Sequence, residues 1–493
     1  MSAASLPQAD ARVSPEDFKQ RSHESLHDAH LRQSFRGAMD FLVERRALQF
    51  PDLQAFNTLR KLGENVRQHA LAQLPDLLER LEARLTELGV AVHWAETPAD
   101  ANRIFLDIAR RHAATLMVKG KSMVSEEIGL NHEMAAHGVE CIETDMGEYI
   151  LQLDGDRPSH IIMPAIHKTK EDVAAIFHEH IDGAPLSDDV NELIAIGRRA
   201  LREKFASAKI GVSGVNFMVA ETGTLALVEN EGNGRLCTSV PDVHVAITGL
   251  EKVVDRLEHV LPLYALLPKS ATGQAVTTYL NLITGPRRAG EKDGPREMHL
   301  ILLDNGRTQA YREARFRATL QCIRCGACMN HCPVYTRVGG LSYGTTYPGP
   351  IGAIISPHLM GLQSTRDLPT ASSLCGACGD VCPVGIPIPD MLMKLREAGR
   401  HSVAESITPP AQALVGQGSV RRAGEVLAWR AWRVLYSHAA LYRLFAWLAP
   451  RLRWLTPAWQ GGWTASRAAL KPAPRSLREQ LARRRAGRTV PGR

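Results

Sequence analysis

The sequence lacks any apolar run long enough to cross a membrane, because no stretch approaches the roughly 18 uninterrupted apolar residues that a spanning helix needs. The opening stretch, MSAASLPQADARVSPEDF, also lacks the apolar core behind a basic start that marks a secretory signal. These two absences argue against the integral membrane and secreted classes. They predict a soluble, cytoplasmic protein.

Dispersed cysteines are also missing, because seven of the nine cysteines fall between residues 322 and 382. A disulfide framework needs cysteines spread over the fold, whereas clustered free thiols suit a reducing compartment and metal binding. The other two, Cys141 and Cys237, stand alone in the sequence. We expect each of them to be a small buried side chain and not a reactive thiol.

Nucleotide-binding signatures are absent as well. The glycine-rich stretch ENEGNGR, residues 229–235, contains neither G-x-G-x-x-G nor a Walker lysine, and no flavin motif is visible elsewhere. Taken alone, this stretch is therefore most simply a turn.

The chain is long and its charge is unevenly spread. Its 493 residues carry a net charge of +7, with 44% hydrophobic residues, which is enough material for more than one core. From Arg421 onward sixteen Lys and Arg face two acidic residues, a net charge of +14, so residues 1–420 together carry −7. The C-terminal region also holds six of the seven tryptophans, which suits a partner-protein surface or a membrane face.

Apolar spacing changes along the chain. Residues 14–89 show helical spacing, which predicts an N-terminal helical arm. From residue 90 helical segments alternate with short strand-like runs: VAVHWAE, ATLMVKGK, VECIETD, HIIMPAIH, FMVAETG, TLALVEN, VHVAITG and MHLILLDNG. Thr97 and Pro98 fit the N-cap and first turn of one such helix. Alternation of strand and helix predicts a largely parallel sheet covered by helices.

We therefore predict an α/β fold organised in four parts. Residues 1–70 form the helical arm, 71–306 the α/β domain, 310–400 a two-cluster α-helical cysteine domain, and 405–493 a basic C-terminal region. We expect this last region to be partly helical, with its apolar helix stopped by Pro450. Its final twenty or so residues lack core-forming side chains, and we expect them to be disordered in isolation.

One cysteine motif carries the strongest chemical signal. It matches C-x2-C-x2-C-x3-C-P residue for residue, with its thiols at Cys322, Cys325, Cys328 and Cys332. Three cysteines on one tight loop can bind three corners of a cubane, and the fourth, before Pro333, points to a second cluster. Zinc is the alternative, but zinc ligands usually come as two separated pairs. The motif therefore predicts iron-sulfur clusters.

A second run keeps the same register with one thiol missing. Three cysteines stand at the matching spacings, and Ser372 occupies the position of the first. Under the ligand exchange of two-cluster ferredoxins, the first cluster takes Cys322, Cys325, Cys328 and Cys382. The second cluster is left with Cys332, Cys375 and Cys378.

Three thiolates leave the type of the second cluster open. We predict two iron-sulfur clusters and expect the 4Fe-4S type. For the second cluster two alternatives stay open, a 3Fe-4S cluster or a 4Fe-4S cluster with a non-cysteine fourth ligand. That ligand is Ser372, a hydroxide, a partner's side chain or a substrate oxygen, and Ser372 is the least favoured protein ligand because a serine hydroxyl holds its proton near neutral pH. The 42 residues between Cys332 and Cys375 include the helix-forming YPGPIGAIISPHLMG. This spacing resembles the α-helical ferredoxin module of succinate dehydrogenase.

Polar residues at predicted strand ends give a weaker signal. Lys119 and the pair Glu126-Glu127 follow one strand, Glu221 precedes a turn, and Arg235 ends the glycine-rich stretch. Loops at strand ends bind ligands in open α/β sheets, so a carboxylate substrate can face Lys119, Lys121 or Arg235. Lys119, Glu221 and Arg235 are therefore candidate catalytic residues. The pair Glu126-Glu127 is more simply a solvated helix start.

The motifs VKGKSMVSEEIGLN, AETGTLALVENEGNGR, YLNLITGPRR and SSLCGACGDVCPVGIPIP, with the first cysteine motif, resemble the lactate utilization protein B family from about residue 15 to 400. The resemblance implies a LUD domain, similar in fold to the CoA-transferase and ribose-5-phosphate isomerase group, followed by a ferredoxin module. It further implies the iron-sulfur subunit of a non-flavin L-lactate dehydrogenase, which oxidises L-lactate to pyruvate and supports growth on lactate. It assigns no catalytic residues, and the Trp- and Arg-rich tail departs from the family pattern.

The resemblance also implies partners. These are a cysteine-rich subunit similar to heterodisulfide reductases and a smaller subunit with a LUD domain alone, and L-lactate is a candidate ligand. The alternative function is an iron-sulfur relay and assembly subunit of another respiratory or hydroxy-acid oxidoreductase, with catalysis wholly in a partner. No nucleic acid is expected, because the basic residues are confined to the tail without a recognition motif. Peripheral membrane contact through the tail is consistent with its tryptophans and arginines.

Overall fold

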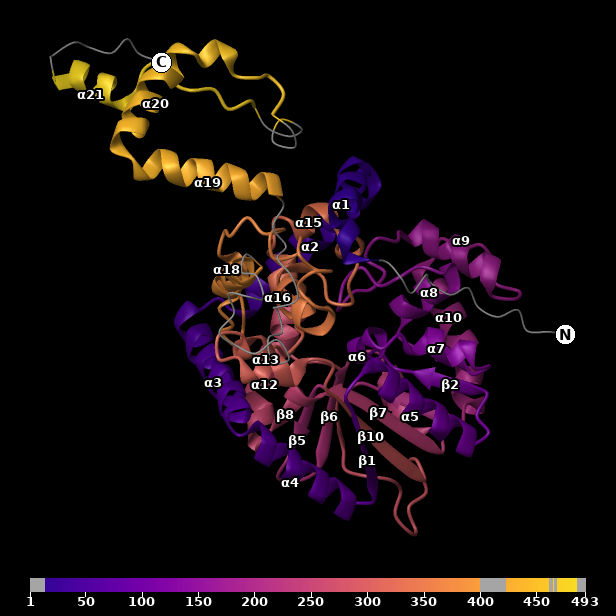
Figure 1. Ribbon diagram of the computed structural model, residues 1–493. Coiled ribbons are helices and arrows are strands. Elements are labelled where there is room, and N and C mark those ends of the chain that lie inside the picture. The colour runs from indigo at the N-terminus through magenta and orange to yellow at the C-terminus, as the bar shows by residue number, and fades with distance from the viewer. Residues whose placement is uncertain (1–13, 400–422, 461–463, 465–467, 486–493) are drawn as a thin grey trace. The chain divides into compact units, whose positions relative to one another are not determined.

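The computed structural model describes residues 14–399, 423–460, 464 and 468–485. The chain divides into two compact units, Met1–Ser419 and Val420–Arg493. The first unit contains both sheets (Figure 1). All nine cysteines also belong to it.

The first unit begins with the predicted helical arm. Its elements are η1 (Pro15–Asp17), α1 (Phe18–His27), α2 (Ala29–Gln49), α3 (Leu53–Ala72) and α4 (Leu74–Glu87). Aspartates start two of these helices, because Asp28 accepts a hydrogen bond from the backbone of Leu31 and Asp52 from that of Gln54. Helices α1 and α2 pack on the cysteine region, whereas α4 packs on the main sheet (Figure 1). The arm therefore joins the two parts of this unit.

The main sheet has six strands in the order β1-β10-β7-β4-β2-β3, and every neighbouring pair is parallel. The strands are β1 (Val90–Ala95), β2 (Leu116–Lys119), β3 (Glu140–Glu143), β4 (Ile210–Ser213), β7 (Val243–Gly249) and β10 (Glu297–Leu303). Alternate residues of each strand face opposite layers. Ile301 packs with the helices of one face, whereas Leu300 and Leu302 pack with α4 on the other. The predicted parallel sheet is confirmed.

Helices cover both faces of the main sheet and connect its strands. They are α5 (Pro98–Arg111), α6 (Met123–Glu127), α7 (Leu130–Ala136), α8 (Met146–Asp154), α9 (Lys170–His180), α10 (Val190–Ser207) and α11 (Asn233–Ser239). Helix α5 begins as predicted, since Thr97 and Asp100 form a reciprocal capping box with Pro98 in the first turn. The lone thiols Cys141 and Cys237 are buried against this layer, also as predicted.

A smaller sheet of four strands lies beside the main one in the order β8-β5-β6-β9. Its strands are β5 (Phe217–Val219), β6 (Thr224–Glu229), β8 (Val253–Val254) and β9 (Tyr279–Ile283). The antiparallel hairpin of β5 and β6 turns at Gly223, where φ is +66°. The remaining short elements of this part are η2 (Leu250–Lys252), η3 (Leu257–His259), α12 (Val260–Ala271) and α13 (Arg307–Arg312).

The cysteine region follows as short helices and loops. Its elements are η4 (Arg317–Gln321), α14 (Ala327–Asn330), α15 (Tyr335–Val338), η5 (Leu341–Tyr343), α16 (Gly349–Met360), α17 (Ala377–Asp380) and α18 (Ile388–Ala398). Six of its cysteines share one hydrophobic core with residues of α2, α3 and α12. The cysteine loops are therefore built into the body of the protein and do not form a free appendage.

The prediction of a strand at HIIMPAIH, residues 160–167, is wrong. This segment forms consecutive turns, in which the ring nitrogen Nδ1 of His160 accepts hydrogen bonds from the backbone of Ile162 and Met163, each at 3.1 Å. Ser159 donates its backbone N–H to the carbonyl of Pro164 at 3.1 Å. Because these local bonds already satisfy its backbone, this apolar segment does not pair with a strand of either sheet.

The second unit contains α19 (Ala423–Ser437), α20 (Ala439–Arg451), η7 (Arg453–Leu455) and α21 (Leu477–Arg485). Pro450 lies in the last turn of α20, as the predicted helix stop requires. Helix α21 falls within the segment for which we expected disorder in isolation, and residues 486–493 lie outside the described residues. Across the helices that the structure describes, none combines the length and apolar character of a membrane span.

Candidate metal centre

The two cysteine loops have the same backbone conformation. Arg324 and Leu374, one residue before the second thiol position of each loop, both adopt a left-handed φ, of +61° and +56°. Gly326 and Gly376 follow with φ of +76° and +91°, and each begins a four-residue helix, α14 or α17. Positive φ at a non-glycine residue is uncommon, so its recurrence indicates a true structural repeat.

Ser372 occupies the structural position of Cys322 in this repeat. The backbone N–H of Arg324 donates to Sγ of Cys322 at 3.3 Å, and that of Leu374 donates to Oγ of Ser372 at 3.1 Å. The second loop therefore keeps its shape although one thiol is missing.

Four thiols form a buried group: Cys322, Cys325, Cys328 and Cys382. Burial, with smaller contributions from the charges of Cys322 and Cys382, raises the pKa of Cys325 to about 12. Burial also raises the pKa of Cys328 well above its usual range, again with contributions from the other three. These four side chains therefore lie within electrostatic reach of one another, on two loops that the sequence separates.

The other three thiols form a second group that reaches solvent. Cys332 and Cys378 are buried, but Cys375 is exposed. Burial raises the pKa of Cys378 to about 12, with contributions from Cys332 and Cys375. The division of the seven thiols between two clusters stays a prediction.

The donor set fits iron-sulfur clusters. Within the described ranges, no three His, Cys, Asp or Glu side chains are arranged to hold a single metal ion. Two guanidinium donors beside the first group, Nε of Arg46 and Nη1 of Arg324, are buried and have no hydrogen-bond acceptor among the described residues. Closely grouped thiols, which resist ionisation when buried, are thiolates once iron is bound, and cluster sulfur accepts hydrogen bonds. A bound cluster would be held by the thiols, and its sulfur atoms would offer acceptors to these two donors.

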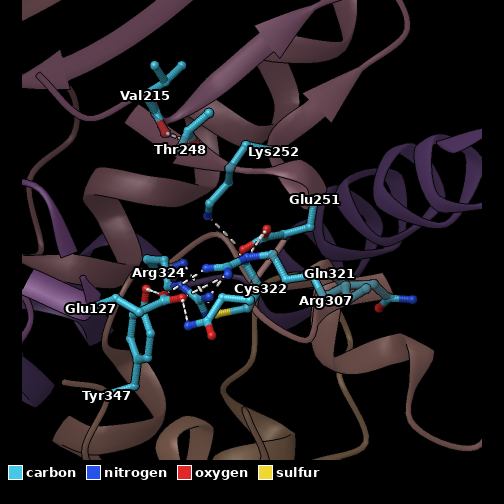
Figure 2. A network of polar contacts seen from close by, with 12 residues as sticks. Glu127, Val215, Thr248, Glu251, Lys252, Arg307, Gln321, Cys322, Arg324 and Tyr347 are labelled. Atoms are coloured by element: carbon cyan, nitrogen blue, oxygen red, sulfur yellow. Dashed lines mark hydrogen bonds and ion pairs between the residues drawn. The ribbon is translucent and has the colours of Figure 1, made fainter. Parts of the chain in front are cut away.

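A buried ion network connects the first group to the α/β domain (Figure 2). Arg324 donates to Glu251 at 3.2 Å and stacks over Tyr347, with its guanidinium carbon 4.3 Å from the ring centroid. Arg307 donates to Glu251 at 2.7 Å and to both oxygens of Glu127 at 2.8 Å, and the hydroxyl of Tyr347 also donates to Glu127 at 2.8 Å. Burial alone would raise the pKa of Glu251, but Arg307 and Arg324 lower it to about 2. The Glu251 carboxylate is therefore charged between these two arginines.

Two further basic side chains, Arg67 and a lysine whose pKa burial lowers to about 7, hold the backbone at the start of the first loop. Lys252 donates to the carbonyl of Cys322 at 3.0 Å (Figure 2). Arg67, on α3, is 1% exposed and donates to the carbonyls of Gln321 at 3.2 Å and Leu320 at 3.0 Å. These bonds fix the loop from two elements outside the cysteine region.

The sequence prediction missed most of this network. It treated Glu127 as a solvated helix residue, but its side chain is 4% exposed because Arg307 and Tyr347 cover it. Glu251 and Arg307 carried no motif at all. In the sequence, the only indication of this network was Arg324, an arginine inside a cysteine loop.

Lys119 lies at the carboxyl end of β2 and is fully buried. Its ammonium contacts Glu143 at 2.7 Å and Glu126 at 2.9 Å, and donates to the hydroxyl of Ser125 at 3.1 Å. Burial alone would lower the pKa of Lys119, but the two carboxylates raise it well above its usual range. Its charge is thus already paired within the chain.

The other two candidates, Glu221 and Arg235, lie at opposite ends of β6. Glu221 lies at one end of the β5–β6 hairpin, where it accepts a hydrogen bond from the backbone of Leu257 at 3.2 Å. Arg235 lies beyond the opposite end of β6, on α11, with its guanidinium 5.7 Å from the Tyr279 ring centroid. Since β6 spans Thr224–Glu229, a whole strand separates Glu221 from Arg235.

Three family models match most of the chain from residue 78 onward. A model of the LUD domain matches residues 78–303, a 4Fe-4S dicluster domain matches residues 318–386, and the C-terminal domain of lactate utilisation protein B matches residues 400–486. The last match overturns our expectation that the Trp- and Arg-rich tail departs from the family. The dicluster match supports iron-sulfur clusters as the cofactor.

Several curated proteins are similar over most of their length. An uncharacterized electron transport protein, YkgF of Escherichia coli K12, is 43% identical over 78% of this chain and 81% of its own. Lactate utilization protein B 2 of Bacillus mycoides and lactate utilization protein B of Bacillus cereus are each 42% identical over 89% of both chains. A solved DUF162 family protein from Deinococcus radiodurans covers 47% of this chain and 98% of its own at 17% identity, but its TM-score of 0.26 is too low to show a shared fold.

Proposed function

Because the chain belongs to the lactate utilization protein B family, we propose that it is the iron-sulfur electron-transfer subunit of a complex that oxidises L-lactate to pyruvate, allowing growth on lactate. The observation that carries the proposal is the similarity to proteins named for lactate utilization over 89% of the chain, including both cysteine loops. The grouping of seven thiols beside buried cations supports an electron-transfer role.

The ligand assignment is part of this proposal. The first cluster takes Cys322, Cys325, Cys328 and Cys382. The second takes Cys332, Cys375 and Cys378, with one iron free of cysteine. The mutual electrostatic effects of the thiols within each group support this division.

Oxidation of lactate to pyruvate releases two electrons and two protons. Bound clusters supply one-electron carriers, so two sites can take both electrons singly. The residues of this chain bury the first group away from water, while the second group opens to solvent at Cys375. We propose that electrons enter or leave through this exposed edge, where a partner can approach.

The alternative is an iron-sulfur relay and assembly subunit of another respiratory or hydroxy-acid oxidoreductase, with catalysis wholly in a partner. A specific observation favours placing catalysis in a partner. The ammonium of Lys119 is enclosed by Glu126 and Glu143, and a strand separates Glu221 from Arg235. The charge of Lys119 is therefore already paired, and Glu221 and Arg235 lie too far apart to hold one carboxylate together. Accordingly, lactate chemistry is assigned to the partners, a cysteine-rich subunit similar to heterodisulfide reductases and a subunit with a LUD domain alone.

The C-terminal unit is proposed to make peripheral membrane contact. Its exposed side chains include Trp429, Trp432, Trp447, Trp454 and Trp459. Arginines alternate with these tryptophans, which suits an anionic lipid interface. Binding to anionic vesicles that is lost at high salt would support this contact, and a lack of vesicle binding at low salt would contradict it.

Reconstitution tests the function directly. The lone chain, the two partners alone and all three proteins together are supplied with L-lactate and an artificial electron acceptor, and pyruvate is measured. We expect pyruvate only from the complete set. Pyruvate from the lone chain would place the substrate site here and refute the assignment of catalysis to the partners. A full rate without this chain would refute its role as the electron carrier.

A further inference from the structure

Three arginines surround the first thiol group, and two of them come from the helical arm. Arg46, on α2, donates to the carbonyl of Val381 at 3.2 Å, and Arg60, on α3, donates to the carbonyl of Gly379 at 2.9 Å. Both carbonyls belong to the loop that presents Cys382. Together with Arg324 they surround the group with positive charge.

Arg46 is held in a fixed position. Its guanidinium carbon lies 5.0 Å from the ring centroid of Phe50 and 5.1 Å from that of Phe56. Burial lowers the pKa of Arg46, and the charges of Cys325 and Cys382 oppose this effect. Its Nε donor has no acceptor in the described part of the chain. A buried donor without an acceptor is costly, so this orientation is explained if a cluster atom accepts the bond.

The second thiol group is built differently. Leu374 stands at the repeat position of Arg324 and is 37% exposed. The charges that act on Cys378 are those of Cys332 and Cys375, which are members of the same group. Exposure of Cys375 lets water solvate this site. The same backbone repeat therefore holds one site among cations and the other against solvent.

This difference bears on reduction. One-electron reduction adds one negative charge to a site, and burial opposes added charge because water no longer solvates it. Cations and hydrogen bonds to cluster sulfur offset this cost and raise the reduction potential. In the proposed function the electron comes from oxidation of the hydroxy acid.

We infer that Arg46, Arg60 and Arg324 keep the buried first site reducible, by supplying the charge stabilisation that water supplies at the second site. The inference rests on the proposed cluster assignment. It makes the helical arm part of the electron-transfer centre. The three arginines affect the reduction potential of the first site and take no part in lactate chemistry.

The test is a potentiometric titration with dithionite, read by EPR, on the reconstituted full-length protein with its iron counted. Arg46→Gln and Arg60→Gln should each make reduction of the first site at least about tenfold less favourable. This corresponds to a reduction potential about 59 mV lower for one electron, as expected for loss of a unit charge within about 10 Å. Arg46→Lys keeps the positive charge, so the reduction potential of its first site should stay close to that of the unmodified protein. Arg36→Gln is the control, since that arginine on the same helix is 69% exposed and pairs with Asp40.

A gain-of-function variant tests the converse. Leu374→Arg places a cation at the repeat position of Arg324 and should raise the potential of the second site, whose signal is identified by its loss in Cys375→Ala. Unchanged potentials in Arg46→Gln and Arg60→Gln, with iron content intact, would overturn the inference and leave the proposed function standing. If these two variants lose iron, an unchanged second-site potential in Leu374→Arg would overturn it. Failure of the unmodified chain to assemble clusters would instead refute the proposed function.

Discussion

Replacing Arg307 by methionine tests whether the buried ion network holds the cysteine region to the α/β domain. Arg307 is 1% exposed and makes three hydrogen bonds to carboxylates, one to Glu251 at 2.7 Å and two to Glu127 at 2.8 Å. Methionine fills much of the same volume without the charge. The change leaves two buried carboxylates without their main counter-ion.

The expected cost follows from the partners that remain. Removal of one member of a buried ion pair costs about 3–5 kcal/mol, because the other charge stays buried. Glu251 keeps Arg324 at 3.2 Å, and Glu127 keeps the amide of Asn305 at 2.7 Å and the hydroxyl of Tyr347 at 2.8 Å. These contacts place the expected loss near the lower end, at about 3 kcal/mol.

Urea unfolding at pH 7.5, followed by circular dichroism, measures this loss. The control is Arg103→Met, an exposed arginine paired with Asp100 on α5, which should cost no more than about 0.5 kcal/mol. Adding Glu127→Gln to Arg307→Met should restore part of the stability, since it removes one uncompensated charge. A loss below about 1 kcal/mol for Arg307→Met, or no recovery in the double variant, would refute the reasoning.

Three further predictions concern stability. Burial lowers the pKa of His160 to about 4. As the pH falls below 6.5, the unfolded chain therefore binds a proton at this histidine before the folded chain does, and the folded state loses stability. The unmodified protein should therefore lose about 2 kcal/mol more than His160→Gln between pH 7.5 and 5 in urea unfolding, and equal losses would contradict this. Burial and the charge of Glu143 raise the pKa of Glu148, whose oxygens have no hydrogen-bond partner among the described residues. The folded state then holds this proton above pH 4.5 and stability falls as the pH rises, so Glu148→Gln should stabilise by about 1–2 kcal/mol at pH 8 and by less at pH 5. A thermal melt with no pH-dependent gain would refute that account. Finally, a Cβ at Gly340 would lie 1.7 Å from the carbonyl oxygen of Ser159, whereas one at Gly37 meets nothing within 4 Å. Gly340→Ala should cost about 2 kcal/mol or more and Gly37→Ala should stabilise by up to about 1 kcal/mol, and similar melting temperatures for the two would be inconsistent with the described packing.

The features that were predictable from the sequence are local ones. The cysteine loops were recognisable because their ligands lie three or four residues apart, and the strands because buried parallel strands are continuous apolar runs. The helix at residues 98–111 was recognisable from its cap. HIIMPAIH failed as a strand because its hydrogen bonds are made by the ring of His160 and by turns, which an apolar run does not reveal.

The features that escaped prediction depend on contacts between distant parts of the chain. Arg307 meets Glu127 across 180 residues and Glu251 across 56, and Arg46 meets the second cysteine loop across 335. Each of these residues is an ordinary surface type when viewed in its own segment. Only the packing of the arm and the α/β domain on the cysteine region shows that their charges are buried beside thiols.

The most direct test of the central claim is EPR of the reconstituted three-protein complex after addition of L-lactate under anaerobic conditions. We predict that L-lactate generates the signals of reduced clusters in this chain within the complex, and that D-lactate, or L-lactate added to the lone chain, does not. Reduction by dithionite but never by L-lactate in the complete complex would contradict the account.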